Sequence, residues 1–462
     1  MRHPLSFAVL GCLSLAGLGA EISDPFATEA MAPPRPSPAL AGRQGGSPCA
    51  AALPATALTA IDAVDLALCN NPQTREVWAN ARAQAALVGV AEAAWLPSLN
   101  GSVAVSRNWK DGAATDQRSA ALVLSWLLFD FGTRSANGEI ARQLLAASAA
   151  TQDATVQQLF LSALQSYYSA QATRAGVEAA REAERASQES YLAADTRYRV
   201  GVATPADRLQ AQTAWSQATL NRIRAEGDAR NALGTLANVL GFDAPQPFVL
   251  AEFPAAMPTA GFERDVNALI DEARRRRPDL RSAEAQVNAA QATVKAARAN
   301  GLPTLSLAAG PTWQDVGGNS TGGGVLGVTL SLPLFSGFET TYRVRSAQAL
   351  AEARAAQRDR VRQQVALDVW RAYQSLATST QALKTAADLV ASAEASERVA
   401  LGRYKAGVGN ILDVLNAQSA LAAARQQRIQ ASLDWNVYRA TLAQSVGALD
   451  YGLLQPMAEG NR

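Results

Sequence analysis

RYRVGVATPADRLQAQ, at residues 197–212, returns as RYKAGVGNILDVLNAQ at residues 403–418. The two stretches lie 206 residues apart and keep Arg-Tyr, Gly, Asp and Ala-Gln at matching places. A repeat at a fixed spacing indicates a tandem duplication. We place the two copies at residues 61–246 and 267–452, with residues 247–266 as the linker. The same offset relates other residues without a gap: Pro72 and Pro278, Pro97 and Pro303, Tyr167 and Tyr373, and Gly241 and Gly447.

Each copy predicts the same series of helices. In the first copy we expect a helix over residues 60–94, a helix of nearly 70 residues over 133–199, a glycine turn at 200–205 and a last helix ending at Leu240. The turn of the second copy lies at residues 406–411. At 1.5 Å per residue the long helix would reach ~100 Å, and the two shorter helices stacked end to end match it. Apolar residues three and four apart predict coiled-coil packing: Val156, Phe160, Ala163, Tyr167, Ala170 and Val177.

Each copy also predicts one β-hairpin, over residues 97–131 and 303–337. In the first hairpin we expect strands at 99–108 and 121–129 and a polar loop at 109–119. In the second strand, leucine and tryptophan alternate with small or polar residues, as in strands that face lipid on one side. Four strands cannot close a membrane barrel, which needs at least ~8, so we expect subunits to share one barrel. Aromatic residues gather at the strand ends, as at a membrane interface: Trp109, Trp313, Phe129, Phe131, Phe335 and Phe338.

The first residues of the chain predict export, and their removal would exclude several kinds of active site and metal site. Residues 1–20 are typical of a cleavable signal peptide, residues 21–60 of an extended leader rich in Pro, Gly and Ala, and residues 453–462 of a C-terminal tail. The only histidine, His3, leaves with the signal. Its loss excludes Ser-His-Asp triads and zinc sites of the Cys/His type. We therefore expect no enzyme activity, no cofactor and no metal.

Two short motifs have simpler interpretations than their functional ones. GGGVLG at residues 322–327 matches the dinucleotide pattern GxGxxG, but it precedes a strand where that pattern needs a helix, so we interpret it as a hairpin loop. The four arginines at residues 274–277 are interpreted as a solvated helix end. With a net charge of only +2, the chain has no broad attraction for nucleic acid, and we expect no nucleic-acid partner.

The chain resembles the TolC family of outer-membrane factors over nearly its whole mature length. The resemblance rests on the two RY–G–D–AQ stretches, on LPSL at residues 96–99, LPTL at 302–305 and LPLFSG at 332–337. It implies an α+β membrane protein of the Gram-negative outer membrane. The implied assembly is a homotrimer, with one β-barrel of twelve strands in lipid and an α-barrel of twelve long coiled-coil helices in the periplasm.

The segment at residues 58–100 is similar to the subgroup of this family that serves type I secretion. That similarity implies a passive exit duct for an exported protein of the RTX-toxin class. The implied partners are a periplasmic membrane-fusion adaptor, an inner-membrane ABC transporter, the exported protein and outer-membrane lipid. The alternative within the family is the duct of a multidrug efflux pump. A structural coiled coil without a pore would show the same helices and is the third hypothesis.

The two glycine turns are the candidate functional site. Gly201 and Gly407 can take the left-handed conformation that ends a helix. The resemblance implies that these turns form the periplasmic tip, where Asp413 lines an acidic constriction that favours cations. Asp207 is the counterpart of Asp413 in the first copy. For both aspartates, simple helix capping is the other interpretation.

The neighbours of these turns complete the candidate site and also depart from the family pattern. Tyr198, Tyr404 and Arg403 belong to the repeated motif. Gly409 stands where the family has an arginine that ties neighbouring helices together, and Asn416 stands where it has a second aspartate. We therefore expect a gate that is weaker than in the family or that uses other charged residues.

Cys49 and Cys69 are the only cysteines of the mature chain. Disulfides form and persist in the oxidising periplasm. We therefore expect a disulfide between these two residues, which would tie the leader to the first helix.

Overall fold

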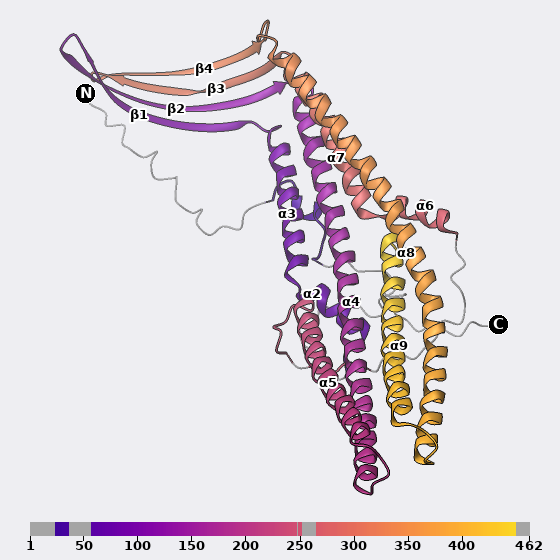
Figure 1. Ribbon diagram of the computed structural model, residues 1–462. Helices are drawn as coiled ribbons and strands as arrows, with labels where there is room; N and C mark the ends of the chain where they lie inside the picture. Colours follow the sequence, from indigo (N-terminus) through magenta and orange to yellow (C-terminus); the bar gives the residue numbers. More distant parts are fainter. Residues whose placement is uncertain (1–23, 37–56, 247, 252–264, 450–462) are drawn as a thin grey trace.

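The computed structural model describes residues 24–36, 57–246, 248–251 and 265–449. Figure 1 shows a four-stranded sheet at one end of the molecule and long helices that run away from it side by side. The predicted signal peptide, most of the leader, most of the linker, Cys49 and the C-terminal tail lie outside the described residues.

The same series of elements occurs twice, which confirms the predicted α+β class built from a duplicated unit. After a short α1 (Thr28–Met31), the first copy contains α2 (Ala60–Asn70), α3 (Pro72–Ala93), β1 (Ser98–Lys110), β2 (Ala113–Phe129), α4 (Thr133–Arg199) and α5 (Pro205–Val239). The second copy contains α6 (Val266–Arg276), α7 (Pro278–Ala299), β3 (Thr304–Val316), β4 (Asn319–Ser331), α8 (Glu339–Lys405) and α9 (Ile411–Val446). None of the helices in the described ranges is long and apolar enough to cross a membrane.

The two hairpins form one antiparallel sheet in the order β1-β2-β3-β4. β2 pairs with β3, so Trp126 lies opposite Leu307 and the sheet joins the two copies directly. β1 and β4 each pair on one side only, which makes them the edge strands of this sheet. Side chains on the strands are largely exposed in the single chain, as at Leu330, which is 57% exposed.

The strands are longer than the sequence predicts. The polar stretch at residues 109–119 is not a loop, because β1 and β2 run through it and turn only at residues 111–112, where both φ values are positive. The GGGVLG stretch at residues 322–327 lies inside β4, and residues 317–318 make the turn instead. Pairing across a hairpin satisfies the backbone N–H and C=O groups whatever the side chains are, so polar residues and glycines continue the strands.

The first helix of each copy is divided in two, so the predicted continuous helix over residues 60–94 is wrong. α3 begins at Pro72, and α7 begins in the same way at Pro278. Proline has no N–H to donate, and it disfavours helix at the residue before it. Asn71 caps the new helix, since its side chain accepts a hydrogen bond from the Gln73 N–H at 2.9 Å.

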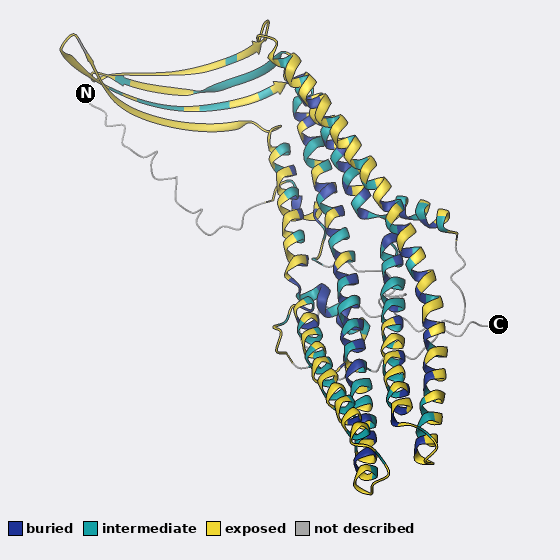
Figure 2. Ribbon diagram, in the orientation of Figure 1, coloured by how far each residue is buried: buried dark blue, intermediate teal, exposed yellow. Residues whose placement is uncertain are grey.

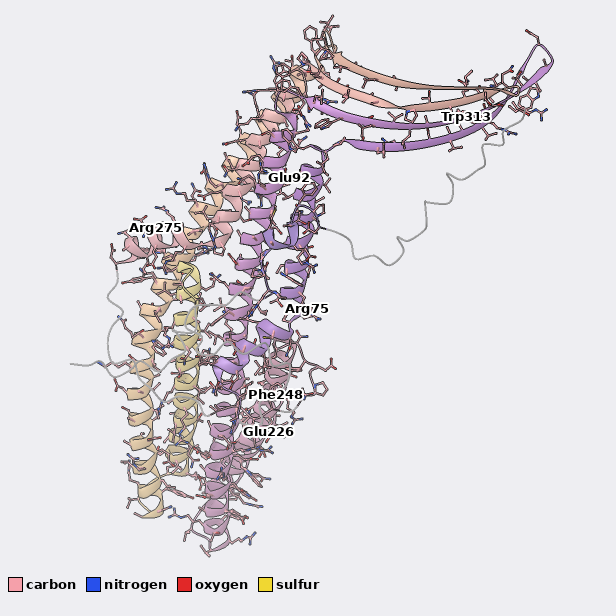
Figure 3. All side chains as sticks on the ribbon, turned by 180° about the vertical axis from the view of Figure 1, so that it is seen from behind. Arg75, Glu92, Glu226, Phe248, Arg275 and Trp313 are labelled. Carbon is pink, nitrogen blue, oxygen red and sulfur yellow. The ribbon has the colours of Figure 1, made fainter. Side chains whose placement is uncertain are left out.

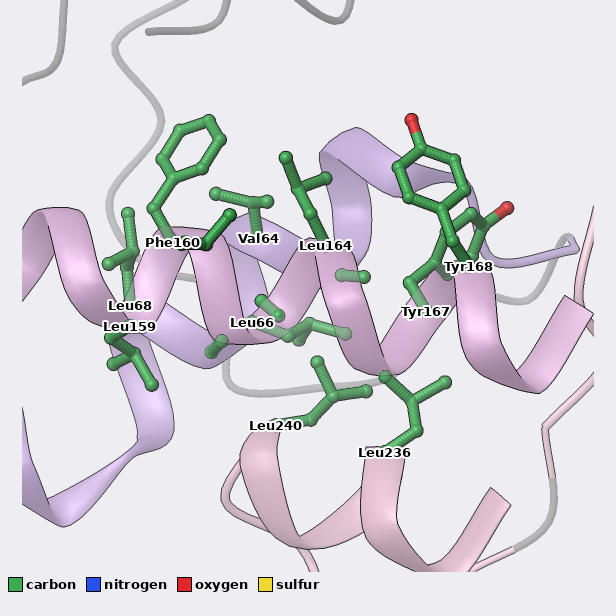
Figure 4. Packing of buried hydrophobic residues seen from close by; sticks show 14 of the residues in the cluster. Val64, Leu66, Leu68, Leu159, Phe160, Leu164, Tyr167, Tyr168, Leu236 and Leu240 are labelled. Atoms are coloured by element: carbon green, nitrogen blue, oxygen red, sulfur yellow. The ribbon is translucent and has the colours of Figure 1, made fainter. Parts of the chain in front are cut away.

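The largest hydrophobic cluster packs α2, α4 and α5 together. Figure 4 shows Phe160, Leu164 and Tyr167 of α4 beside Val64 of α2 and Leu236 of α5. Full burial of such an apolar side chain stabilises the fold by about 1.5–3 kcal/mol. Five of the six predicted coiled-coil residues of the long helix, all except Val177, therefore lie in this core.

Tyr167 is a polar member of this cluster. Its hydroxyl donates a hydrogen bond to the Leu58 carbonyl oxygen at 3.0 Å and accepts one from Gln171 Nε2 at 2.9 Å. Burial raises the pKa of Tyr167 to about 12. The hydroxyl therefore stays protonated and holds α4 against the chain that enters α2.

A buried ion pair holds the connection between the sheet and the helices in the first copy. Asp130 and Arg134 are 4% and 5% exposed, and the Asp130 Oδ2 to Arg134 Nε distance is 3.2 Å. The same carboxylate oxygen accepts the backbone N–H of Arg134 at 2.8 Å. The guanidinium also donates to the carbonyl oxygens of Ala94 and Leu128 and lies over the Trp95 ring, 4.3 Å from its centroid. One cation thus joins the ends of α3, β2 and α4.

The described part of the leader is not fully extended, which corrects the prediction. Residues 28–31 form one helical turn, α1. The segment then follows α3, where Trp78 Nε1 donates to the Pro33 carbonyl oxygen at 2.9 Å and Ala32 packs with Val88. Gln152 Nε2 of α4 donates to the Arg35 carbonyl oxygen at 2.9 Å. The leader is therefore bound to both helices.

Candidate functional site at the helix tips

The two glycine turns lie at the end of the molecule opposite the sheet (Figure 1). Gly201 and Gly407 have φ values of +78° and +79°, which favour glycine. In the first turn the Val202 N–H donates back to the Arg197 carbonyl oxygen at 2.9 Å, and Val408 repeats this bond in the second turn. This pattern closes the end of a helix. The left-handed conformation at this position explains why glycine is repeated in the two RY–G–D–AQ stretches.

Asp207 is engaged in capping α5. Its Oδ2 accepts the Thr204 N–H at 2.9 Å, and the Asp207 N–H donates to Thr204 Oγ1 at 3.2 Å. These reciprocal bonds form a capping box, which is the simpler of the two interpretations offered by the sequence.

Asp413 differs from Asp207 although it is its counterpart. The cap of α9 is Asn410, whose Oδ1 accepts the Leu412 N–H at 3.1 Å. The Asp413 carboxylate forms no hydrogen bond or ion pair with any described residue, and it is exposed. Its charge near the start of α9 is favoured by the helix dipole. Of the two predicted aspartates, Asp413 is therefore the one whose carboxylate is available at the tip.

Asp413 lies in an open groove of about 650 Å³ between α8 and α9. Arg403 and Asn416 line the same groove, and most of the other wall residues are alanines. The structure thus brings three of the predicted residues together. Tyr198 and Gly201 lie on the other turn, together with Asp207.

The two turns pack against each other through an apolar cluster that includes Tyr404, Ile411 and Ala211. Tyr404 is only 5% exposed. The Arg197 guanidinium lies over its ring, 4.3 Å from the centroid, and donates from Nη2 to the Tyr404 carbonyl oxygen at 2.6 Å. Tyr198, the counterpart of Tyr404, is 38% exposed. The repeated Arg-Tyr pair therefore has one buried and one exposed tyrosine.

A charged network holds the first turn and was not predicted from the sequence. Asp195 pairs with Arg199 and with Arg208, each at 2.8 Å, and so ties α4 to α5. A hydrogen bond to the Tyr191 hydroxyl raises the pKa of Arg208, and the Asp195 charge acts in the same direction. Tyr191 stacks on Trp215, with ring centroids 5.4 Å apart. The spacing of four between Asp195 and Arg199 was the available sequence signal.

The described residues contain no group of His, Cys, Asp or Glu side chains that could hold a metal ion. The predicted tip residues instead form the two glycine turns that join the helices, and they leave the Asp413 carboxylate exposed. The exposed Asp413 carboxylate places a negative charge in the groove between α8 and α9.

Cys69 of α2 is disulfide-bonded. Cys49 lies outside the described residues, so the pairing of Cys49 with Cys69 stays a prediction. We expect thiol labelling of the unreduced, denatured mature chain to find no free thiol, and labelling after reduction to find two. In a Cys49→Ser variant, one free thiol should appear without reduction. Two free thiols in the unreduced chain would contradict the bond.

Comparisons with known proteins agree on one family. The model of the family described as "Outer membrane efflux protein" matches residues 63–242 and 269–448. Protein CyaE of Bordetella pertussis is 32% identical over 381 residues, which cover 80% of each chain. The outer membrane efflux protein BepC of Brucella suis is 28% identical and covers 82% of this chain and 83% of its own. The alkaline protease secretion protein AprF of Pseudomonas aeruginosa is 27% identical and covers 87% of each.

Solved structures show the same fold at lower identity. The outer-membrane channel OprN superimposes with a TM-score of 0.76 at 20% identity, over 84% of this chain and 90% of that one. The outer membrane protein VceC of Vibrio cholerae gives a TM-score of 0.74, also at 20% identity, over 84% and 96%.

Proposed function

Since this chain belongs to the outer membrane efflux protein family, whose members are trimeric channels extending from the outer membrane into the periplasm, we propose that it is the exit duct of a type I secretion system. The family and the fold are those of channel proteins and not of enzymes. In this proposal the chain is a passive conduit, and energy comes from an inner-membrane ABC transporter.

The observation that carries this proposal is the similarity to CyaE, at 32% identity over most of both chains. AprF, which is named for the secretion of alkaline protease, supports protein export as well. The segment at residues 58–100 is similar to the type I secretion subgroup, and the chain resembles the cyclolysin secretion outer-membrane protein. The proposed cargo is therefore an RTX-type toxin such as cyclolysin.

Exposed valines at the tips support docking of a second protein there. Val200, Val202 and Val408 are 67%, 71% and 70% exposed. When a partner protein covers apolar side chains that are grouped at the end of a helical tube, their burial stabilises the complex. We assign this surface to the periplasmic membrane-fusion adaptor, which would join the duct to the transporter.

Deletion of the gene tests the proposed function. We expect the culture medium of the deletion strain to lose one exported protein, while susceptibility to small toxic compounds stays unchanged. The second candidate, a multidrug efflux duct, is favoured by the similarity to BepC and predicts the reverse result. A deletion strain with neither change would contradict both. Expression of the gene from a plasmid should restore the lost phenotype.

Asp413 is proposed to control ion passage at the tip. Replacing Asp413 by Asn in all three subunits removes the free carboxylates, so we expect lower cation selectivity and weaker block by multivalent cations. Planar-bilayer recordings measure both quantities. Asp207→Asn is the matched control, because the Asp207 side chain completes the capping box of α5 as its N3 residue, and weakening that hydrogen bond should cost about 1 kcal/mol of stability without changing selectivity. If Asp413→Asn left both quantities unchanged, Asp413 would have no gate role.

A further inference from the structure

The helix ends nearest the sheet carry different charges in the two copies. In Figure 1, α3 and α4 meet the sheet in the first copy, and α7 and α8 meet it in the second. Residues 292–299 and 339–348 of the second copy contain four cationic side chains and one anionic side chain, which gives a net charge of +3. The corresponding residues 86–93 and 133–142 of the first copy contain two of each and have no net charge. One corner of the chain is therefore basic and its counterpart is not.

In the first copy an ion network joins the two helices at this corner. Arg142 of α4 bridges two carboxylates: its Nη1 lies 3.0 Å from Glu92 Oε1 of α3, and its Nη2 lies 3.5 Å from Glu139 Oε2 of α4. Figure 3 shows Glu92 near the end of α3 that meets the sheet. One positive group thus spans two negative positions, one on each helix.

The second copy reverses the sign of both positions. The offset of 206 places Arg298 of α7 and Arg345 of α8 where the first copy has the two carboxylates, and Gln348 where it has the bridging arginine. α7 and α8 have the same lengths as α3 and α4, so these residues lie at the same helical turns. All three are exposed, and none of their side chains forms a hydrogen bond or ion pair with a described residue. A group that bridges these two positions must therefore be negative.

A third cation, Lys295, lies on a face of α7 whose counterpart on α3 is covered by the leader. The offset of 206 carries Lys295 onto Gly89 of α3, where an added Cβ atom would lie 2.9 Å from the Thr28 Cγ2 methyl. Lys295 is exposed and has no ion pair within the described ranges. Lys295 and Arg298 are three residues apart, so they lie on one face of the helix. The basic corner therefore has an accessible surface.

Exposed apolar side chains lie between the sheet and these cations. Leu334, Phe335, Phe338 and Tyr342 are 93%, 77%, 66% and 64% exposed. Figure 2 shows much of the start of α8 as exposed, beside the end of the sheet. The Arg345 guanidinium lies 5.7 Å from the centroid of the Tyr342 ring. Aromatic side chains are enriched at the level of the lipid headgroups, so this corner has the character of a membrane interface.

The position of the cations along α8 matches the headgroup layer of a bilayer. α8 begins at Glu339. A helix rises 1.5 Å per residue, so Arg345 lies about 9 Å from the start of α8. The headgroup region extends roughly 5–8 Å beyond the hydrocarbon on each side of a bilayer. Since α8 runs from the sheet into the periplasm, the cations lie at the periplasmic leaflet.

We propose that Arg298 and Arg345 bind the phosphate group of an anionic phospholipid in the periplasmic leaflet of the outer membrane. The phosphate takes the bridging place that Arg142 holds in the first copy. Guanidinium groups donate paired hydrogen bonds to phosphate oxygens, Gln348 adds an amide N–H, and Lys295 adds a further positive charge. The acyl chains lie against the exposed apolar residues of this corner. The site depends on the membrane location of the family and not on the exported cargo.

Lipid titration followed by native mass spectrometry tests this site on the whole channel. The delipidated trimer should bind phosphatidylglycerol more tightly than phosphatidylethanolamine, which carries the same phosphate but no net charge. Each basic residue near an anionic lipid surface strengthens binding about fivefold, so Arg298→Gln should weaken phosphatidylglycerol binding about fivefold and Arg298→Gln/Arg345→Gln roughly 25-fold. Arg142→Gln is the matched control. It also removes one arginine at this level, but that arginine is engaged by two carboxylates, so the affinity should not change.

Three results would overturn the proposal. The first is equal binding of the two lipids, or unchanged phosphatidylglycerol binding by the double variant. The second is displacement of the lipid by inorganic phosphate at equal concentration, which would assign the site to free phosphate. The third is a monomeric mass for the double variant beside a trimeric unchanged chain, which would assign the arginines to contact between subunits. Loss of the lipid site alone leaves the trimeric channel and the proposed function standing, whereas a monomeric unchanged chain would contradict the channel itself.

Discussion

Replacing Arg134 by Met should lower the free energy of unfolding by about 3–5 kcal/mol, because it leaves the Asp130 carboxylate buried without its counter-charge. Both side chains are almost fully buried, and the guanidinium also satisfies two carbonyl oxygens at the ends of α3 and β2. Methionine keeps the apolar contact with Trp95 but supplies no donor. Chemical denaturation of the purified channel in detergent, followed by circular dichroism, measures the loss.

The duplication supplies a control for this prediction. The second copy has Ser336 and Thr340 at the positions of Asp130 and Arg134. Thr340→Ala should therefore lower the free energy of unfolding by about 1 kcal/mol or less, since it leaves no buried charge without a partner. The double variant Asp130→Ala/Arg134→Met should lower the free energy of unfolding by less than Arg134→Met alone, because no unpaired charge remains. Equal losses for Arg134→Met and Thr340→Ala would refute a special role for the ion pair.

Leu330→Arg should sharply reduce the amount of channel in the outer membrane. Leu330 lies in β4, where the sequence alternates leucine or valine with small or polar residues, and it is 57% exposed in the single chain. A cation facing lipid near the midplane costs ~2–4 kcal/mol, and a trimer would carry three of them. The measurement is the yield of heat-resistant trimer in isolated outer membranes. Leu124→Arg in β2 should act in the same way.

The next residue along β4 gives the matched control. Successive side chains of a strand point to opposite faces, so Thr329 faces away from the side that holds Leu330. Thr329→Arg should therefore leave the trimer yield near that of the unchanged protein. If both arginines reduced the yield equally, the assignment of the lipid face would be wrong.

Much of the fold was predictable because the duplication is visible in the sequence. One offset relates prolines, tyrosines and glycines across the whole chain, and those residues mark helix starts, core positions and turns. The two long helices followed from periodicity over many turns, where local errors average out. The division of the first helix was not predicted, although Pro72 was identified as part of the repeat. The apolar periodicity continues through residue 71, so it gives no sign that Pro72 lacks the N–H that would continue the helix.

The limits of the strands and the contacts of the candidate site were harder to predict than the helices, for one physical reason. Both depend on which hydrogen-bond partner each residue takes, and the periodicity of the sequence does not specify that partner. Polar residues near Asp111 continue a strand because the facing strand supplies their hydrogen bonds. Asp207 and Asp413 occupy equivalent places in the motif, yet only Asp207 is used as a cap, because Thr204 can form the reciprocal bond and Asn410 caps α9 by itself. The ion pair of Asp130 and Arg134 has no counterpart in the second copy and therefore gave no repeat signal.

The one-sided pairing of β1 and β4 has a consequence for how the protein is made. Each edge presents a row of unpaired backbone groups, and such rows recruit other chains into aggregates. A heterologous contact ends in a ring if the rotation closes and in an open fibre if it does not. A newly exported chain is therefore an aggregation hazard until three chains have met and protected one another's edges. Overproduction in the periplasm should raise the proportion of insoluble fibres relative to finished channels, and faster delivery to the outer membrane should lower it.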